Sequence, residues 1–285
     1  MKACCFPFCR GFSLIEMIIA ISVLGILTAS TAVFLRGPIA SYFDTERRVD
    51  IANAGELAMA KMAYEISRAV PNSVRVTIVG SGFYLEFLPV VSEGIYESSQ
   101  PSFAGEGDVP NTGFDALCTP LPAPEVPCPT GMLGDWVVIN NHVASADVWG
   151  GNSRASLTSI VNIAGGVRIN HASMAFVGSE APDHHFQIAS ATPVTYFCDP
   201  TAGVGTLRRF SGYIIQAAQP VIATAAPLAG AQNDLLAAQI TACNARVVPG
   251  NLRRAQVVAL TLTLAAGNPP DSLSLYQAIR VESLP

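Results

Sequence analysis

The first part of the chain would be apolar on every face if it formed a helix. Residues 12–35 read FSLIEMIIAISVLGILTASTAVFL and carry one charge, that of Glu16. A helix of this length matches the hydrocarbon thickness of a bilayer. Lys2 and Arg10 precede the run without any acidic residue. The positive-inside bias therefore predicts a cytoplasmic N-terminus and export of everything that follows the span.

After this run the apolar pattern narrows to one face. The pair Gly37-Pro38 predicts a kink or a brief break, because proline lacks the backbone N–H that a helix uses. Helix is then expected to resume over residues 37–70, until Pro71 ends the pattern. Four apolar residues spaced three or four apart mark a face that packs against a globular domain: Met59, Met62, Ile66 and Val70.

From residue 74 onward the apolar period changes from that of a helix to two. In residues 74–78 apolar side chains alternate with polar or smaller ones, and a second apolar stretch follows at residues 83–87. Gly80-Ser81-Gly82 lies between the two stretches, which predicts a β-hairpin. A short helix is expected over 231–238. Further strands are expected at 136–140, 166–169, 175–177, 195–197, 212–216, 256–264 and 276–281. Turns rather than regular helices separate them, so the fold class predicted is α+β, with a long N-terminal helix packed on an antiparallel β-sheet domain over residues 71–285.

The segment Ser92–Pro129 is rich in Gly, Pro and Ser. Four prolines lie between Cys118 and Cys128, at positions 120, 122, 124 and 127, and exclude a central strand there. We therefore expect the whole segment to be a surface excursion, either a partner-binding loop or a tolerated insertion.

The seven cysteines fall into two groups. Three precede the apolar run, and an even set follows it: Cys118, Cys128, Cys198 and Cys243. In an exported domain four cysteines indicate two disulfides, with three possible connectivities. The connectivity with the shortest loops is Cys118–Cys128 with Cys198–Cys243. A metal site is the less favoured alternative, because neither pair has the C-x-x-C spacing of a zinc site.

Composition and motifs argue against catalysis and against nucleic-acid binding. The formal net charge is −5 and the arginine pairs are scattered, so no basic stripe is formed. The chain contains no nucleophile elbow, zinc-protease motif or phosphate-binding loop. Asp183-His184-His185 with Glu180 could ligate a metal, but solvated loop residues are the more common case. We predict no enzyme activity, no cofactor and no metal.

Three interpretations of the N-terminal segment remain. An ordinary signal peptide cut near Ala29–Ala32 would have a shorter apolar region. A plain signal anchor accepts the length but leaves Glu16 unexplained, since a carboxylate in hydrocarbon is costly. A third interpretation, in which a short leader is cut away in front of the span, accounts for both features.

The residues Arg10-Gly11-Phe12-Ser13-Leu14-Ile15-Glu16 resemble the processing site of type IV prepilins and type II secretion pseudopilins. The resemblance implies removal of a leader, residues 1–11, by a prepilin peptidase that cuts between Gly11 and Phe12. It implies N-methylation of Phe12 and a transmembrane assembly helix over residues 12–36. Glu16 would pair with the new Phe12 ammonium, on its own or a neighbouring subunit, and set the register of assembly.

Three further stretches resemble minor pilins of the mannose-sensitive haemagglutinin (MSHA) pilus: residues 43–75, residues 193–210 with Tyr196 and Arg209, and residues 253–264. This resemblance implies a non-enzymatic subunit that primes a type IV pilus or occupies a sub-tip position, because the tip-capping pseudopilin typically lacks a Glu at the place of Glu16. The alternatives are a minor pseudopilin of a type II secretion system and a pilus-tip adhesin.

The partners implied are other pilins and minor pilins, the prepilin peptidase, the inner-membrane assembly platform and the inner membrane itself, with no nucleic acid. The expected location is the inner membrane, as a single-pass protein with a periplasmic C-terminal domain, and then the extracellular pilus.

Overall fold

The structure is a computed structural model that describes residues 13–96, 111–118, 127–141, 146–176, 184–201, 205–251, 254–266 and 271–281. The chain divides into two compact units, residues 1–50 and residues 51–285. The helix is α1 (Leu14–Ser67), and the first strands are β1 (Arg75–Val79), β2 (Gly82–Phe87), β3 (Val90–Tyr96), β4 (Asn111–Leu117), β5 (Trp136–Ile139), β6 (Arg154–Ile163) and β7 (Gly166–Met174). The others are β8 (His185–Ala189), β9 (Val194–Asp199), β10 (Thr206–Ser211), β11 (Gln232–Ala238), β12 (Ile240–Val248), β13 (Val257–Ala266) and β14 (Asp271–Arg280), with a 3-10 turn η1 (Leu228–Gly230) before β11.

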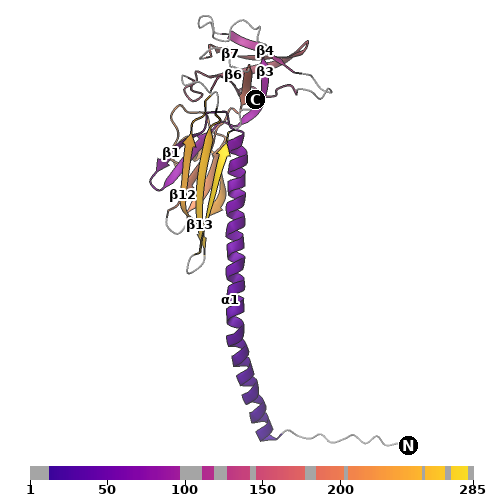
Figure 1. Ribbon diagram of the computed structural model, residues 1–285, viewed down its shortest axis with the longest axis vertical. Coiled ribbons are helices and arrows are strands. Elements are labelled where there is room, and N and C mark those ends of the chain that lie inside the picture. The colour runs from indigo at the N-terminus through magenta and orange to yellow at the C-terminus, as the bar shows by residue number, and fades with distance from the viewer. Residues whose placement is uncertain are drawn as a thin grey trace, which may run out of the picture. The chain divides into compact units, whose positions relative to one another are not determined.

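Helix α1 runs through Gly37-Pro38 without interruption and ends at Ser67 (Figure 1). Of the two outcomes expected at this pair, a kink or a brief break, the break is not formed. Proline removes one intrahelical hydrogen bond, whereas a break would free several backbone groups at the end of an apolar segment. The long helix is therefore continuous through Gly37-Pro38.

The end of α1 packs on two antiparallel sheets, which confirms the predicted α+β class. One sheet has the order β1-β2-β9-β10-β11, and the other has the order β12-β13-β14. The predicted hairpin is formed by β1 and β2, with Thr77 opposite Tyr84. We call residues 51–88 and 191–281 of the described chain, which hold the end of α1 and both sheets, the two-sheet domain.

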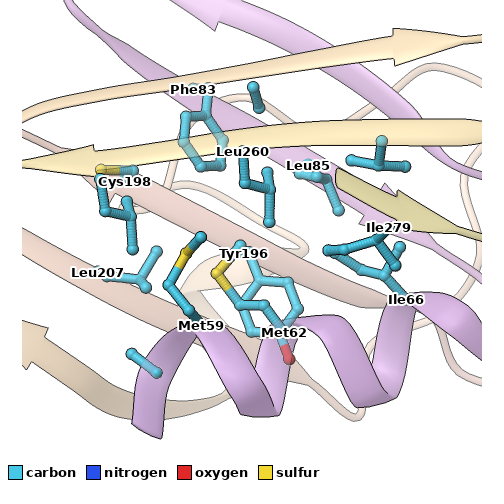
Figure 2. Close-up of a cluster of buried hydrophobic side chains, with 14 of the residues drawn as sticks. Met59, Met62, Ile66, Phe83, Leu85, Tyr196, Cys198, Leu207, Leu260 and Ile279 are labelled. Atoms are coloured by element: carbon cyan, nitrogen blue, oxygen red, sulfur yellow. The ribbon is translucent and has the colours of Figure 1, made fainter. Parts of the chain in front are cut away.

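The core of the two-sheet domain lies beneath the predicted apolar face of α1. Met59, Met62 and Ile66 are at most 4% exposed and point at side chains of both sheets (Figure 2). Gly55 lets the helix approach closely, because a Cβ there would lie 2.8 Å from a Leu275 methyl carbon and 3.0 Å from one of Leu264. Tight packing of this kind makes the helix and the sheets one cooperative core.

The strands between β2 and β9 form a closed barrel with the order β3-β4-β7-β6-β5-β8. In Figure 1 the labels β3, β4, β6 and β7 cluster together, away from β1, β12 and β13. We call residues 90–189 of the described chain the barrel. The expectation that Ser92–Pro129 is entirely a surface excursion is wrong, because it contains most of β3 and all of β4, which pair with β8 and β7. The residues 97–110 and 119–126 of that segment lie outside the described residues.

Three other secondary-structure predictions fail. Residues 231–238, rich in Ala and Leu, were expected to form a helix, but Gln232–Ala238 form strand β11 and pair with β10, because tertiary pairing overrides local preference. Residues 212–216 are not a strand, since β10 ends at Ser211 and Gly212 follows with φ +79°. The strand expected over 175–177 is absent at Ala175 and Phe176, and Val177 lies outside the described residues.

The two disulfides of the structure are those with the shortest loops. Cys118–Cys128 joins the end of β4 to the segment that precedes β5, inside the barrel. Cys198–Cys243 joins β9 to β12 and so links the two sheets of the two-sheet domain. Each of the two folded parts therefore has its own covalent crosslink.

We predict that the Cys198–Cys243 bridge stabilises the fold more than the Cys118–Cys128 bridge. Its sequence separation is 45 residues rather than 10, which corresponds to about 4 and about 3 kcal/mol in the loop-entropy model. The double variants Cys198→Ala/Cys243→Ala and Cys118→Ala/Cys128→Ala should be compared by denaturant unfolding of the oxidised chain in detergent, followed by circular dichroism. A larger loss of unfolding free energy in Cys118→Ala/Cys128→Ala would contradict the prediction.

Candidate functional site

Helix α1 begins directly after the predicted cleavage position. The Ser13 hydroxyl oxygen accepts the backbone N–H of Glu16 at 3.3 Å, and the Ser13 carbonyl accepts that of Met17 at 3.2 Å. Ser13 and Glu16 have the S-x-x-E spacing of a capping box, a signal present in the sequence that our prediction did not use. Gly11 and Phe12 lie outside the described residues.

Glu16 lies in the first turn of α1 and is exposed. The positive end of the helix dipole favours a carboxylate at this place. Among the described Lys and Arg side chains none pairs with Glu16.

The apolar segment of α1 can cross a membrane by length and composition. Its most apolar 18-residue window has a mean hydropathy of 2.4, and none of it is buried within the protein. Its hydroxyl groups donate back to carbonyls one turn earlier: Ser22 to Ile18 at 2.6 Å, Thr28 to Leu24 at 2.9 Å, Ser30 to Ile26 at 2.8 Å and Thr31 to Leu27 at 2.7 Å. These polar groups are therefore satisfied without water or a neighbouring helix, which suits a lipid environment.

The start of the chain also matches a known sequence family. Residues 7–32 match the prokaryotic N-terminal methylation motif. The methylation motif contains the predicted cleavage pair, Glu16 and most of the apolar segment, and it supports a type IV pilin-like subunit. The motif implies processing by a prepilin peptidase and assembly with other pilins. Comparison with curated proteins and with solved structures gives no match.

A second polar cluster anchors α1 to the five-stranded sheet. One Glu65 carboxylate oxygen accepts the Tyr196 hydroxyl at 2.7 Å and the Arg209 Nε at 2.9 Å, and the other lies 3.1 Å from the Lys61 Nζ. The Glu65 and Arg209 side chains are each 18% exposed. The sequence prediction did not assign this cluster, although its four members, Lys61, Glu65, Tyr196 and Arg209, lie in two of the stretches that resemble MSHA minor pilins.

The charge state of this cluster follows from its partners. Burial opposes ionisation of Glu65, but hydrogen bonds from Arg209, Tyr196 and Lys61 outweigh it and hold the pKa of Glu65 below its ordinary value. Burial, with the Glu65 charge beside it, raises the pKa of the Tyr196 hydroxyl. Glu65 is therefore an anion and Tyr196 a neutral donor at neutral pH.

A third cluster joins β1 and β2 to the segment after β10. Glu86 is fully buried, and its oxygens accept Arg75 at 2.7 Å and the Tyr213 hydroxyl at 2.8 Å. Burial raises the pKa of Glu86, against the opposing effect of Arg75. Arg75 also donates to the carbonyls of Gln216 and Ala217, so it fixes the chain that the sequence led us to expect as a strand.

The histidines do not assemble a metal site within the described part of the chain. His171 is 2% exposed among aromatic rings of the barrel, and this burial lowers its pKa. The His184 ring lies against Tyr96, whereas Glu180 and Asp183 lie outside the described residues. Over the described ranges no three His, Cys, Asp or Glu side chains are grouped as metal ligands.

We predict that Glu65→Gln lowers the free energy of unfolding at pH 7 by about 1.5–3 kcal/mol, the usual value of hydrogen bonds to a charged group. The folded pKa of Glu65 lies below the ordinary 4.5, so this stabilisation is present above pH 4.5 and is lost as the pH falls through the folded pKa. Urea unfolding should be measured in detergent at several pH values from 7 down to 3. The difference in free energy of unfolding between Glu65→Gln and the wild type should become smaller as the pH falls. The control is Glu56→Gln, on the exposed side of the same helix. A difference in free energy of unfolding that does not change with pH would contradict the electrostatic explanation.

Proposed function

We propose that the protein is a minor pilin-like structural subunit that takes part in assembly of a type IV pilus of the MSHA kind, in a priming or sub-tip position. The observation that carries the proposal is the methylation motif placed at the start of an apolar helix whose far end packs on β-sheets. A subunit of this design is held in the membrane before assembly and keeps its folded domain outside the lipid.

The finer part of the proposal is supported by the residues that resemble the MSHA minor pilin MshO. Two of the resembling stretches meet in the Glu65 cluster, because Tyr196 and Arg209 both donate to the Glu65 carboxylate. In this interpretation the resemblance reflects a shared way of fixing the helix on the sheet.

The proposed maturation divides the chain into four parts. Residues 1–11 are the cleaved leader, and residues 12–36 are the transmembrane and assembly helix. Residues 37–70 are the membrane-distal part, and residues 71–285 are the β-rich domain, which we place in the periplasm and then in the extracellular fibre. The pairing of Glu16 with the methylated Phe12 ammonium would remove an isolated charge from the lipid and fix the axial register of the subunits.

Two other candidate functions use the same maturation. A minor pseudopilin would serve type II secretion, and an adhesin would bind a surface from the pilus tip. Deletion of the gene distinguishes them: loss of fibres supports assembly, loss of secretion with intact fibres supports the pseudopilin, and loss of attachment with intact fibres supports the adhesin.

We expect the mature protein to begin at an N-methylated Phe12. Mass spectrometry of the N-terminal peptide should find this terminus in cells that have a prepilin peptidase, and an uncut residue 1–11 leader in cells that lack it. A terminus near Ala29–Ala32, or an intact Met1 in both strains, would contradict the proposed maturation.

We further expect Glu16→Gln to reduce incorporation into fibres at least tenfold while leaving cleavage intact, because the variant keeps the shape of the side chain but cannot balance the Phe12 ammonium. Sheared fibres from a deletion strain that expresses the variant should be quantified by immunoblotting. Ser22→Ala serves as the control, since that hydroxyl bonds only to its own helix. Normal incorporation of Glu16→Gln would exclude the charge-pairing role.

A further inference from the structure

The barrel interrupts a sheet that is otherwise continuous. Strands β2 and β9 are hydrogen-bonded neighbours, with Phe87 opposite Val194. The whole closed barrel, β3 to β8, lies in the connection between them. Neighbouring antiparallel strands need a turn of only two residues. The barrel is thus an addition that the pairing of β2 with β9 does not require.

The two ends of this addition lie side by side. The Ser190 N–H donates to the Pro89 carbonyl at 2.9 Å, and Val90 lies opposite Ala189 in the pairing of β3 with β8. When the two ends of an inserted domain lie close together, the domain can be added or removed without displacing the domain that carries it. The chain leaves the five-stranded sheet and returns to it at nearly the same place.

The barrel and the two-sheet domain each have a main hydrophobic core, and a smaller third cluster lies where they meet. In this third cluster Val70 and Leu88 pack with residues of the barrel: Val138, Val148, Trp149 and Ala189. The core beneath α1 draws its buried residues from positions 58–87 and 194–281, and none from the described residues between them. The barrel core draws its buried residues from positions 96–188 alone. Cys118–Cys128 lies on the barrel side and Cys198–Cys243 on the other. Each part therefore has the core and the crosslink needed to fold by itself.

Polar contacts add to this third cluster in fixing the barrel on the turn that follows α1. The Asn141 side chain donates to the Pro71 carbonyl at 2.7 Å, and the Trp149 indole N–H donates to the Ser73 carbonyl at 2.9 Å. The Arg75 guanidinium lies 3.8 Å from the centre of a Trp149 ring. These contacts orient the barrel, but they contribute nothing to the core that holds α1 on the sheets.

We propose that the barrel is a display module, carried by the subunit and not required for its polymerisation, whereas α1 and the two-sheet domain carry the assembly function. This inference rests on the proposed function, and it divides that function between two parts of one chain.

The first test removes the barrel. Residues Pro89–Thr192 are replaced by Asn-Gly, a two-residue hairpin turn that joins Leu88 to Pro193. In a deletion strain the shortened chain should form the Cys198–Cys243 disulfide, as measured by thiol alkylation, and restore fibre number to within twofold of the full chain. A shortened chain that forms the disulfide but yields at least tenfold fewer fibres would overturn the inference.

The same strains separate this inference from the proposed function. If the full chain restores fibres and the oxidised shortened chain does not, only the display role fails. If deletion of the gene never reduces fibre number, the assembly role itself fails.

The second test uses the full chain, so it does not depend on the folding of the shortened one. A short epitope is inserted in the β6–β7 turn between Ala164 and Gly165, where both residues are exposed. We expect fibre number to stay within twofold of the unmodified chain, and antibody to label intact fibres. Normal fibres that antibody cannot label, or a correctly oxidised chain that no longer forms fibres, would show that the barrel is buried in the assembly.

Discussion

One helix has to satisfy two different surroundings, and the remaining structure is arranged around that requirement. The first half of α1 is apolar on all sides and bonds its hydroxyl groups to its own backbone. The second half buries one face, in which Met59, Met62 and Ile66 fill the core beneath both sheets. Burial of that face gives the sheets a common core, and without it each would expose an apolar side to water.

Polar contacts then fix how the helix lies on its core. Apolar packing alone tolerates small shifts of a helix along a sheet. Glu65, in contrast, accepts hydrogen bonds from Tyr196 and Arg209 in one geometry only. The barrel is held in a comparable way by Asn141 and Trp149, which bind carbonyls of the turn after the helix. Charged and amide groups thus specify the arrangement, and the apolar core supplies most of the stability.

Local signals predicted the parts of the structure that local physics decides. The apolar span, the β1–β2 hairpin and the shortest-loop disulfides all depend on residues close in sequence or on simple counting. Long-range pairing decided the rest. Strand β11 has helix-favouring residues but pairs with the edge of β10, and most of β3 and all of β4 lie in a segment whose glycines and prolines suggested a loop. The partners of Glu65 on the sheet, Tyr196 and Arg209, are separated from it by 131 and 144 residues, so no local pattern could reveal them.

The position of the helix at the start of the chain also sets an order of events in biosynthesis. The side chains that cover Met59 and Ile66 include Leu260, Leu262 and Ile279, which belong to the last two strands. A chain is synthesised from its N-terminus, so the apolar face of α1 emerges long before its covering does. Until the final strands are synthesised this apolar face lacks its covering, and a chain truncated before β13 would keep the face exposed.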